Sequence, residues 1–233
     1  MRVRAPNPSP LTLDGTNTYV IEGWVVDPGP DDAAHLDAVL AAASDPLRGI
    51  ALTHDHSDHS DGAGRLSELA GGIPVERLAD GERAGPFEAI ATPGHAADHV
   101  CLLAGRICFS GDTVLGAGSV FVGSDGGSMA AYMESLERLR ALDLEVICPG
   151  HGPFVWDPRA KIEEYIAHRL ERERKVLDAL EAGAATRDEI LDRAWDDVDF
   201  EAVPMLRLAA AATLDAHLVK LRQEGRLPRE PTG

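Results

Sequence analysis

The sequence has few cysteines and no long apolar run. Its 233 residues include three cysteines, too few for a disulfide framework, which favours a reducing compartment such as the cytoplasm. No stretch reaches the roughly 18 consecutive apolar residues that a membrane-spanning helix needs, so we expect no contact with a membrane. The first ten residues, MRVRAPNPSP, have no apolar region after their arginines and therefore do not resemble a secretory signal.

Positive charge is also scarce. The chain has 22 basic residues against 39 acidic ones, a formal net charge of −17. Residues 1–157 account for −14 of this charge (9 basic against 23 acidic) and residues 158–233 for −3 (13 against 16). Because nucleic acids are bound largely through neutralisation of phosphates by Lys and Arg, this balance argues against long-range attraction of RNA or DNA. It favours a small or neutral substrate.

The first part of the chain alternates between strands and helices, typical of an α/β domain. Apolar and β-branched runs predict two hairpins and three further strands, at residues 18–30, 99–112, 48–54, 87–95 and 144–151. Helices are expected at residues 31–43, 62–70 and 132–142. We place the boundary of this first domain at residue 157.

The remaining residues, 158–233, predict a small domain of three helices. The first runs over residues 157–183, the second begins at a capping box of Thr186 and Glu189, and the third covers residues 203–225. The apolar residues expected on the buried face of the first helix are Ile162, Ile166, Leu170, Leu177 and Leu180. The arginine-rich stretch HRLERERK (168–175) is interpreted as a solvated face, with a phosphate- or carboxylate-binding rim as the alternative.

Residues 52–62, LTHDHSDHSDG, concentrate potential metal ligands at the end of an apolar strand. His54 and His56 are two positions apart, so on an extended segment both point to one side and can bind one ion. If the chain then bends into the helix after Gly62, Asp58 and His59 can reach a second ion. Imidazole and carboxylate are the ligands that zinc accepts where no thiolate is offered, and iron or manganese can use the same donors.

Three later strand ends carry suitable ligands in turn contexts: His95 in TPGH, Asp112 in SGD and His151 in PGHG. We expect His95 to complete the first site, His151 the second, and Asp112 to bridge them. His99 is a candidate for supporting a ligand. The glycine-rich loop after Asp112 is expected to border the site, with Phe121 or Tyr132 near the substrate.

In order and spacing these motifs resemble those of the metallo-β-lactamase superfamily, over residues 11–157. The resemblance implies a four-layer αββα sandwich with the metals at one edge of its two sheets. It implies one zinc on His54, His56 and His95, a second on Asp58, His59 and His151, and Asp112 as the bridge. The stretches TPGHAADHV and YIAHRLERE are similar to the β-lactamase-like endoribonucleases of mitochondria, which implies a winged-helix-like C-terminal domain.

The sequence therefore predicts a hydrolase with two zinc ions that attacks its substrate with a bridging hydroxide. Asp58 is expected to orient the nucleophile or accept its proton as well as to bind metal. The acidic first domain favours a small ester or thioester, whereas the subfamily resemblance favours single-stranded RNA. A third hypothesis is a non-catalytic metal sensor whose helical tail contacts DNA or a partner; the tail is also a candidate for forming a homodimer.

Overall fold

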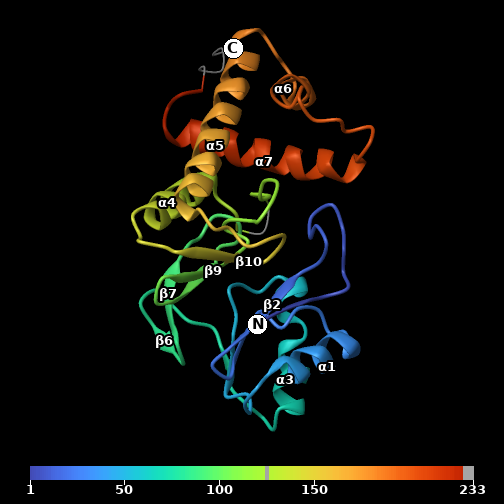
Figure 1. Cartoon of the computed structure of the whole chain (residues 1–233). Coiled ribbons are helices and arrows are strands. Elements are labelled where there is room, and N and C mark those ends of the chain that lie inside the picture. The colour runs from blue at the N-terminus through green and yellow to red at the C-terminus, as the bar shows by residue number, and fades with distance from the viewer. Residues whose placement is uncertain (124–125, 228–233) are drawn as a thin grey trace.

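Two five-stranded sheets form the centre of the molecule (Figure 1). The structure is a computed structural model and describes residues 1–123 and 126–227. The first sheet has the order β1-β2-β3-β4-β5, with strands β1 (Arg2–Arg4), β2 (Asn17–Ile21), β3 (Trp24–Val26), β4 (Gly49–Ala51) and β5 (Val75–Glu76). The second has the order β10-β9-β8-β7-β6, with strands β6 (Arg83–Ala84), β7 (Phe87–Ala91), β8 (Val100–Ala104), β9 (Ile107–Gly111) and β10 (Val146–Pro149). Both sheets mix parallel and antiparallel pairs.

Alternating side chains on the strands divide the core into layers. In β2 and β3, Tyr19 and Val26 pack toward the second sheet, whereas Val20 and Val25 pack on the opposite face. The second sheet alternates in the same way between an inner set (Leu102, Phe109 and Val146) and an outer set (Cys101, Cys108 and Ile147). Because successive side chains of a strand point to opposite faces, both faces of both sheets are buried.

Helices cover the two outer faces. The first sheet is covered by α1 (Ala33–Ala42) and α3 (Ala63–Leu69), and the second by α4 (Met129–Arg140) and the start of α5 (Pro158–Glu181). This arrangement confirms the α/β class and agrees with the predicted αββα sandwich. None of the helices in the described part of the chain is long and apolar enough to cross a bilayer.

The C-terminal region consists of α5, α6 (Arg187–Ala194) and α7 (Pro204–Gln223), with α7 crossing α5 (Figure 1). Their shared core includes Leu191, Trp195 and Leu214. Helix α5 belongs to two cores, because Ile162 packs against the second sheet and Val176 packs among the helices. Residues 158–227 contain three helices and no strand, so the winged-helix form is not shown, and the domain boundary at residue 157 stays a prediction.

His217 of α7 is buried against α5 without a hydrogen bond. It is 1% exposed, and neither ring nitrogen has a partner among the described residues. Its Nδ1 lies 4.0 Å from Glu173 Oε2. Burial lowers the pKa of His217 to about 3, and the positive charges of Arg169, Lys220 and Arg172 act in the same direction. His217 is therefore neutral in the folded protein near neutral pH.

We predict that His217→Leu makes the protein less sensitive to acid. A histidine whose pKa is lowered on folding takes up its proton on unfolding, so it destabilises the fold as the pH falls below the unfolded value of about 6.5. The free energy of unfolding, measured with urea, should fall by about 2 kcal/mol less in the variant than in the wild type between about pH 7.5 and about pH 5. Equal losses in the two proteins would contradict a buried neutral His217.

Candidate metal centre

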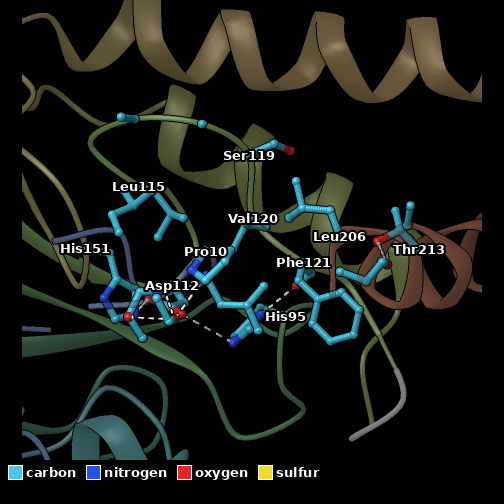
Figure 2. A pocket seen from close by; sticks show the side chains of 18 of the residues that line it. Pro10, His95, Asp112, Leu115, Ser119, Val120, Phe121, His151, Leu206 and Thr213 are labelled. Atoms are coloured by element: carbon cyan, nitrogen blue, oxygen red, sulfur yellow. Dashed lines mark hydrogen bonds and ion pairs between the residues drawn. The ribbon is translucent and has the colours of Figure 1, made fainter. Parts of the chain in front are cut away.

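Four of the seven predicted ligands follow strands that end at one edge of the sandwich. His54 follows β4, His95 follows β7, Asp112 follows β9 and His151 follows β10. Figure 2 shows His95, Asp112 and His151 side by side at the base of a cavity. Strands from both sheets thus deliver these side chains to one place, although up to 97 residues separate them in the sequence.

The other three ligands come from the short helix α2 (Ser57–Ser60), so the chain bends earlier than expected, before Gly62 and the helix that follows it. His56 precedes the helix, and Asp58 and His59 lie within it. The bend places Asp58 Oδ2 3.3 Å from His151 Nε2 and 3.5 Å from His59 Nε2. The structure therefore brings all seven predicted residues together.

The imidazole nitrogens face one another at distances that suit a shared ion. His56 Nδ1 lies 3.0 Å from both His54 Nε2 and His95 Nε2, and His59 Nε2 lies 3.3 Å from His151 Nε2. Two ligands at about 2.1 Å from a tetrahedral zinc are separated by roughly 3.4 Å. Three overlapping sets keep their ligand atoms within 4.8 Å of one another: His54, His56 and His95; His54, His59 and Asp112; Asp58, His59 and His151.

Asp112 lies between the two groups of histidines. Its Oδ1 is 3.3 Å from His151 Nε2 and 3.4 Å from His59 Nε2, and its Oδ2 is 3.7 Å from His95 Nε2. The buried Oδ1 makes no hydrogen bond to the described residues. Burial alone would raise the pKa of Asp112, but His151 and His59 hold it well below its usual range. An ionised, buried and unpartnered carboxylate oxygen fits a position between two cations.

Asp27, at the end of β3, orients two of the ligands from behind. His59 Nδ1 donates to Asp27 Oδ2 at 2.8 Å, and the Thr53 hydroxyl donates to the same oxygen at 2.7 Å. Because the Thr53 hydroxyl already donates its hydrogen bond to Asp27, it acts as the acceptor for the N–H of His54 Nδ1, 3.0 Å away. Both imidazoles therefore turn the lone pair of Nε2 toward the cluster, which is the arrangement a metal ligand requires.

Three of the remaining ligands are held in a similar way. His95 Nδ1 donates to the backbone carbonyl of Phe121 at 2.6 Å, and the Thr16 hydroxyl donates to Asp58 Oδ2 at 3.3 Å. The backbone N–H of Asp112 donates to His99 Nε2 at 3.0 Å, so His99 supports a ligand without facing the cluster. Lone pairs and carboxylates that converge in a buried site fit a pair of divalent cations.

Comparison with known proteins agrees with this geometry. The profile of the metallo-beta-lactamase superfamily matches residues 73–151. A beta-lactamase-like protein 2 homolog from Caenorhabditis elegans is 31% identical over 96% of this chain and 84% of its own length. The chain belongs to the metallo-β-lactamase superfamily.

Two further relatives of this chain extend the comparison. An atrochrysone carboxyl ACP thioesterase from Aspergillus fumigatus is 30% identical over 82% of this chain and 72% of its own. The crystal structure of a family protein from Thermus thermophilus covers 99% of this chain and 95% of its own, with a TM-score of 0.75 at 24% identity. None of these relatives is described as acting on RNA, so the expected endoribonuclease subfamily is not shown.

The metal centre of this superfamily member opens into space for a substrate. The cavity has a volume of about 630 Å³ and is lined by His56, Asp58, His95, Asp112 and His151 at its base. Its walls come from the loop after β9, through Val120 and Phe121, and from the C-terminal helices, through Trp195, Leu206 and Ala210 (Figure 2). This size suits a small organic ligand.

Several expectations for this superfamily member need correction. Phe121 lines the cavity as expected, but Tyr132 is fully buried and donates its hydroxyl to Thr113 O. His168, the first residue of the stretch HRLERERK, also lines the cavity. The stretch HRLERERK is not simply a solvated face, because Arg169, Arg172 and Glu173 are buried whereas Leu170 is 51% exposed.

Sequence reasoning missed Asp27, although a signal was present. Asp27 directly follows the apolar run of β3, as four of the predicted ligands follow their strands, but the sequence places it within the predicted hairpin of residues 18–30. Its backbone has φ +47°, a region that few residues other than glycine adopt. Such backbone strain persists where the surrounding contacts enforce it. Here the Asp27 carboxylate accepts three hydrogen bonds, from the hydroxyl of Thr53, the imidazole of His59 and the backbone N–H of Thr53, the last at 2.8 Å.

We predict that Asp27→Asn weakens metal binding by roughly 10- to 100-fold. An amide offers one acceptor where the carboxylate receives three hydrogen bonds, so the orientation of His59 and His54 is lost together. Zinc affinity is to be measured by competition with a chromophoric chelator. The matched control is Asp31→Asn, which changes an exposed aspartate four residues away and should leave the affinity unchanged. Unaltered zinc affinity in Asp27→Asn would refute the role given to this carboxylate.

Proposed function

We propose that this metal-dependent hydrolase cleaves a small ester or thioester. The observation that carries the proposal is the position of the seven-residue cluster at the base of a largely apolar cavity of about 630 Å³. An apolar enclosure of this size suits an acyl group. The relative from Aspergillus fumigatus described as an acyl carrier protein thioesterase supports the same bond type. The formal net charge of −17 favours a small substrate over a polyanion.

In this proposal the seven residues are divided between two ions as the sequence predicts. His54, His56 and His95 would hold one and Asp58, His59 and His151 the other, with Asp112 shared. Two zinc ions bound there would make a water molecule acidic enough to act as a nucleophile near neutral pH and would supply a Lewis acid for the carbonyl oxygen. Iron or manganese can also bind to nitrogen and oxygen donors of this kind. The assignment of zinc is therefore part of the proposal.

Asp58 is the carboxylate of the cluster that also handles a proton. Its side chain is 29% exposed, compared with 12% for Asp112, so it faces the cavity where water enters. Burial alone would raise the pKa of Asp58, but the hydrogen bond with His151 and the charge of His59 lower it by more. The net shift is downward, so Asp58 is ionised at neutral pH. In the proposed reaction Asp58 accepts the proton that water loses as it adds to the acyl carbon. The carbon–sulfur or carbon–oxygen bond then breaks, and the leaving group takes up a proton.

An assay on two substrate classes tests the proposed function. Protein loaded with zinc is incubated with a panel of acyl thioesters and, separately, with labelled single-stranded RNA. We expect turnover of at least one thioester, its loss with a chelator and its return with added zinc, without cleavage of RNA. Cleavage of RNA in the absence of thioester turnover would overturn the proposal in favour of the nuclease hypothesis. Reversible zinc binding without turnover of either class would favour the metal sensor.

We predict that Asp58→Asn lowers kcat for the best thioester by at least about 10²-fold, the usual contribution of a positioned proton acceptor. The matched control is Asp61→Asn, which alters an exposed aspartate that directly follows α2 and should keep the wild-type rate. The metal content of each variant is to be measured by atomic absorption in the same samples. A fully active Asp58→Asn would exclude this residue from the reaction.

A further inference from the structure

Helix α5 carries charged residues on the face that it buries. The buried positions follow helical spacing, and those at the two ends of the face, such as Ile162 and Val176, are apolar. Between them lie Arg169, Arg172 and Glu173, which are 3%, 5% and 4% exposed. A buried charge costs free energy unless an opposite charge or several hydrogen bonds compensate it. Each of these three side chains therefore needs a partner.

Two of the three have partners of opposite charge. Arg172 donates to the two carboxylate oxygens of Asp197 at 2.7 and 3.0 Å. Glu173 accepts from Lys220 Nζ at 2.7 Å and also pairs with Arg226. The charges of Arg172 and Glu173 are thus balanced within the C-terminal helices.

Arg169 has no such partner. Its Nη2 donates to the backbone carbonyl of Val120, and its guanidinium lies over the ring of Tyr132, 5.3 Å from the centroid. Its buried Nε has no hydrogen bond, and no carboxylate of residues 1–123 or 126–227 lies within 4.0 Å of its nitrogens. Tyr132 provides no counter-charge, because burial raises the pKa of its hydroxyl above the usual range.

Arg169 is one of the residues that line the cavity above the metal centre. Arg169 lines that cavity together with Val120, Trp195, Ala210 and Thr213, all of which are buried. The exposed part of the lining lies near the metal centre, at Pro10, Leu11 and Ser57, and also in the loop after β9, at residues 117–119. In Figure 2, Val120 and Phe121 lie between the side chains of the metal centre and those of Leu206 and Thr213 on α7. The cavity thus has the cluster of metal-binding side chains at its base and, in another part of its lining, a buried cation without a carboxylate partner among the described residues.

Neighbouring histidines do not share the positive charge. Burial and the nearby Arg169 lower the pKa of His168 to about 4 and that of His217 to about 3. Both rings are therefore neutral near pH 7. The pairs formed by Arg172 and Glu173 cancel, so Arg169 supplies the net positive charge of this part of the cavity.

We propose that Arg169 binds a carboxylate at the far end of the substrate's acyl group. The inference rests on the proposed function, with the acyl carbon at the metal centre and the apolar middle of the chain against Val120, Phe121 and Leu206. Nε and an Nη of the guanidinium offer two parallel donors, which match the two oxygens of a carboxylate. The thiol or alcohol part leaves past the exposed part of the lining near the metal centre. The substrate class is then an ester or thioester of a dicarboxylic acid, or of another acyl group that ends in a carboxylate.

The test compares aryl thioesters whose acyl chains end either in a carboxylate or in the isosteric carboxamide, in a length series from glutaryl to suberyl. At the best length, the wild type should favour the carboxylate by roughly 10- to 100-fold in kcat/KM, the usual effect of a hydrogen bond to a charged group. Arg169→Met should bring this ratio close to one. Arg174→Met, which alters an exposed arginine on the same helix outside the cavity, should keep the wild-type ratio.

The ratio distinguishes binding from a purely structural role. If Arg169 acted only by fixing the loop through the Val120 carbonyl, Arg169→Met would slow the hydrolysis of both substrates by the same factor. An unchanged ratio in that variant would overturn the proposal. A wild-type ratio near one would also overturn it, and this measurement remains decisive if the variant does not fold.

Calorimetry separates failure of this inference from failure of the proposed function. Zinc-loaded protein is titrated with adipate and with its monoamide, two ligands that need no turnover. Tighter binding of adipate to the wild type, with no difference in Arg169→Met, is the expected result. If that pattern appears without hydrolysis of any thioester, the proposed function fails and the anion site remains. Equal affinities of the wild type for the two ligands would overturn the anion site itself.

Discussion

The site depends on one constraint, which is that the buried carboxylate charge of the cluster can be balanced only by cations. Asp112 is held ionised between His59 and His151 on one side and His95 on the other. The same field acts on the histidines, since burial alone would lower the pKa of His151 whereas Asp112 raises it to about 9. Seven side chains converge on this region from both sheets. Such convergence is unfavourable in an ordinary core, and it becomes favourable around divalent ions.

The fold meets this constraint by making the ligands rigid before a metal arrives. Strand ends fix the positions of the ligands, and acceptors behind the imidazoles fix their rotation. Asp27 shows how closely the two are connected, because its carboxylate joins the backbone and hydroxyl of Thr53 to the ring of His59. The strained backbone of Asp27 is part of the same device, since it directs the carboxylate back across the end of β4. Preorganisation of this kind reduces the reorganisation that binding requires.

The sequence could single out the seven residues that the structure brings together because four of them carry a local signal, an apolar strand followed by a turn and a metal-binding side chain. The other three lie in one dense His/Asp motif at α2. The sandwich was predictable for a related reason, since alternation along the strands reports which faces are buried. The cavity was not predictable, because its lining comes from segments far apart in the sequence, such as residues 9–13, 115–121 and 206–213, that meet only in the folded chain. The helical pattern of α5 was misleading at one turn, where Leu170 faces solvent and Arg169 is buried. Hydrophobic periodicity cannot identify a buried arginine whose partners lie on other elements.

The distribution of charge gives the cavity a selectivity that its shape alone lacks. The chain carries a formal net charge of −17, which repels a polyanion at a distance. Inside, the guanidinium of Arg169 is removed from water and lacks a carboxylate partner among the described residues, so it attracts a single anionic group that enters the cavity. Screening by salt weakens interactions between exposed charges far more than those of a buried pair. A small substrate that presents one carboxylate beyond an apolar span therefore satisfies both conditions, whereas a chain of phosphates satisfies neither.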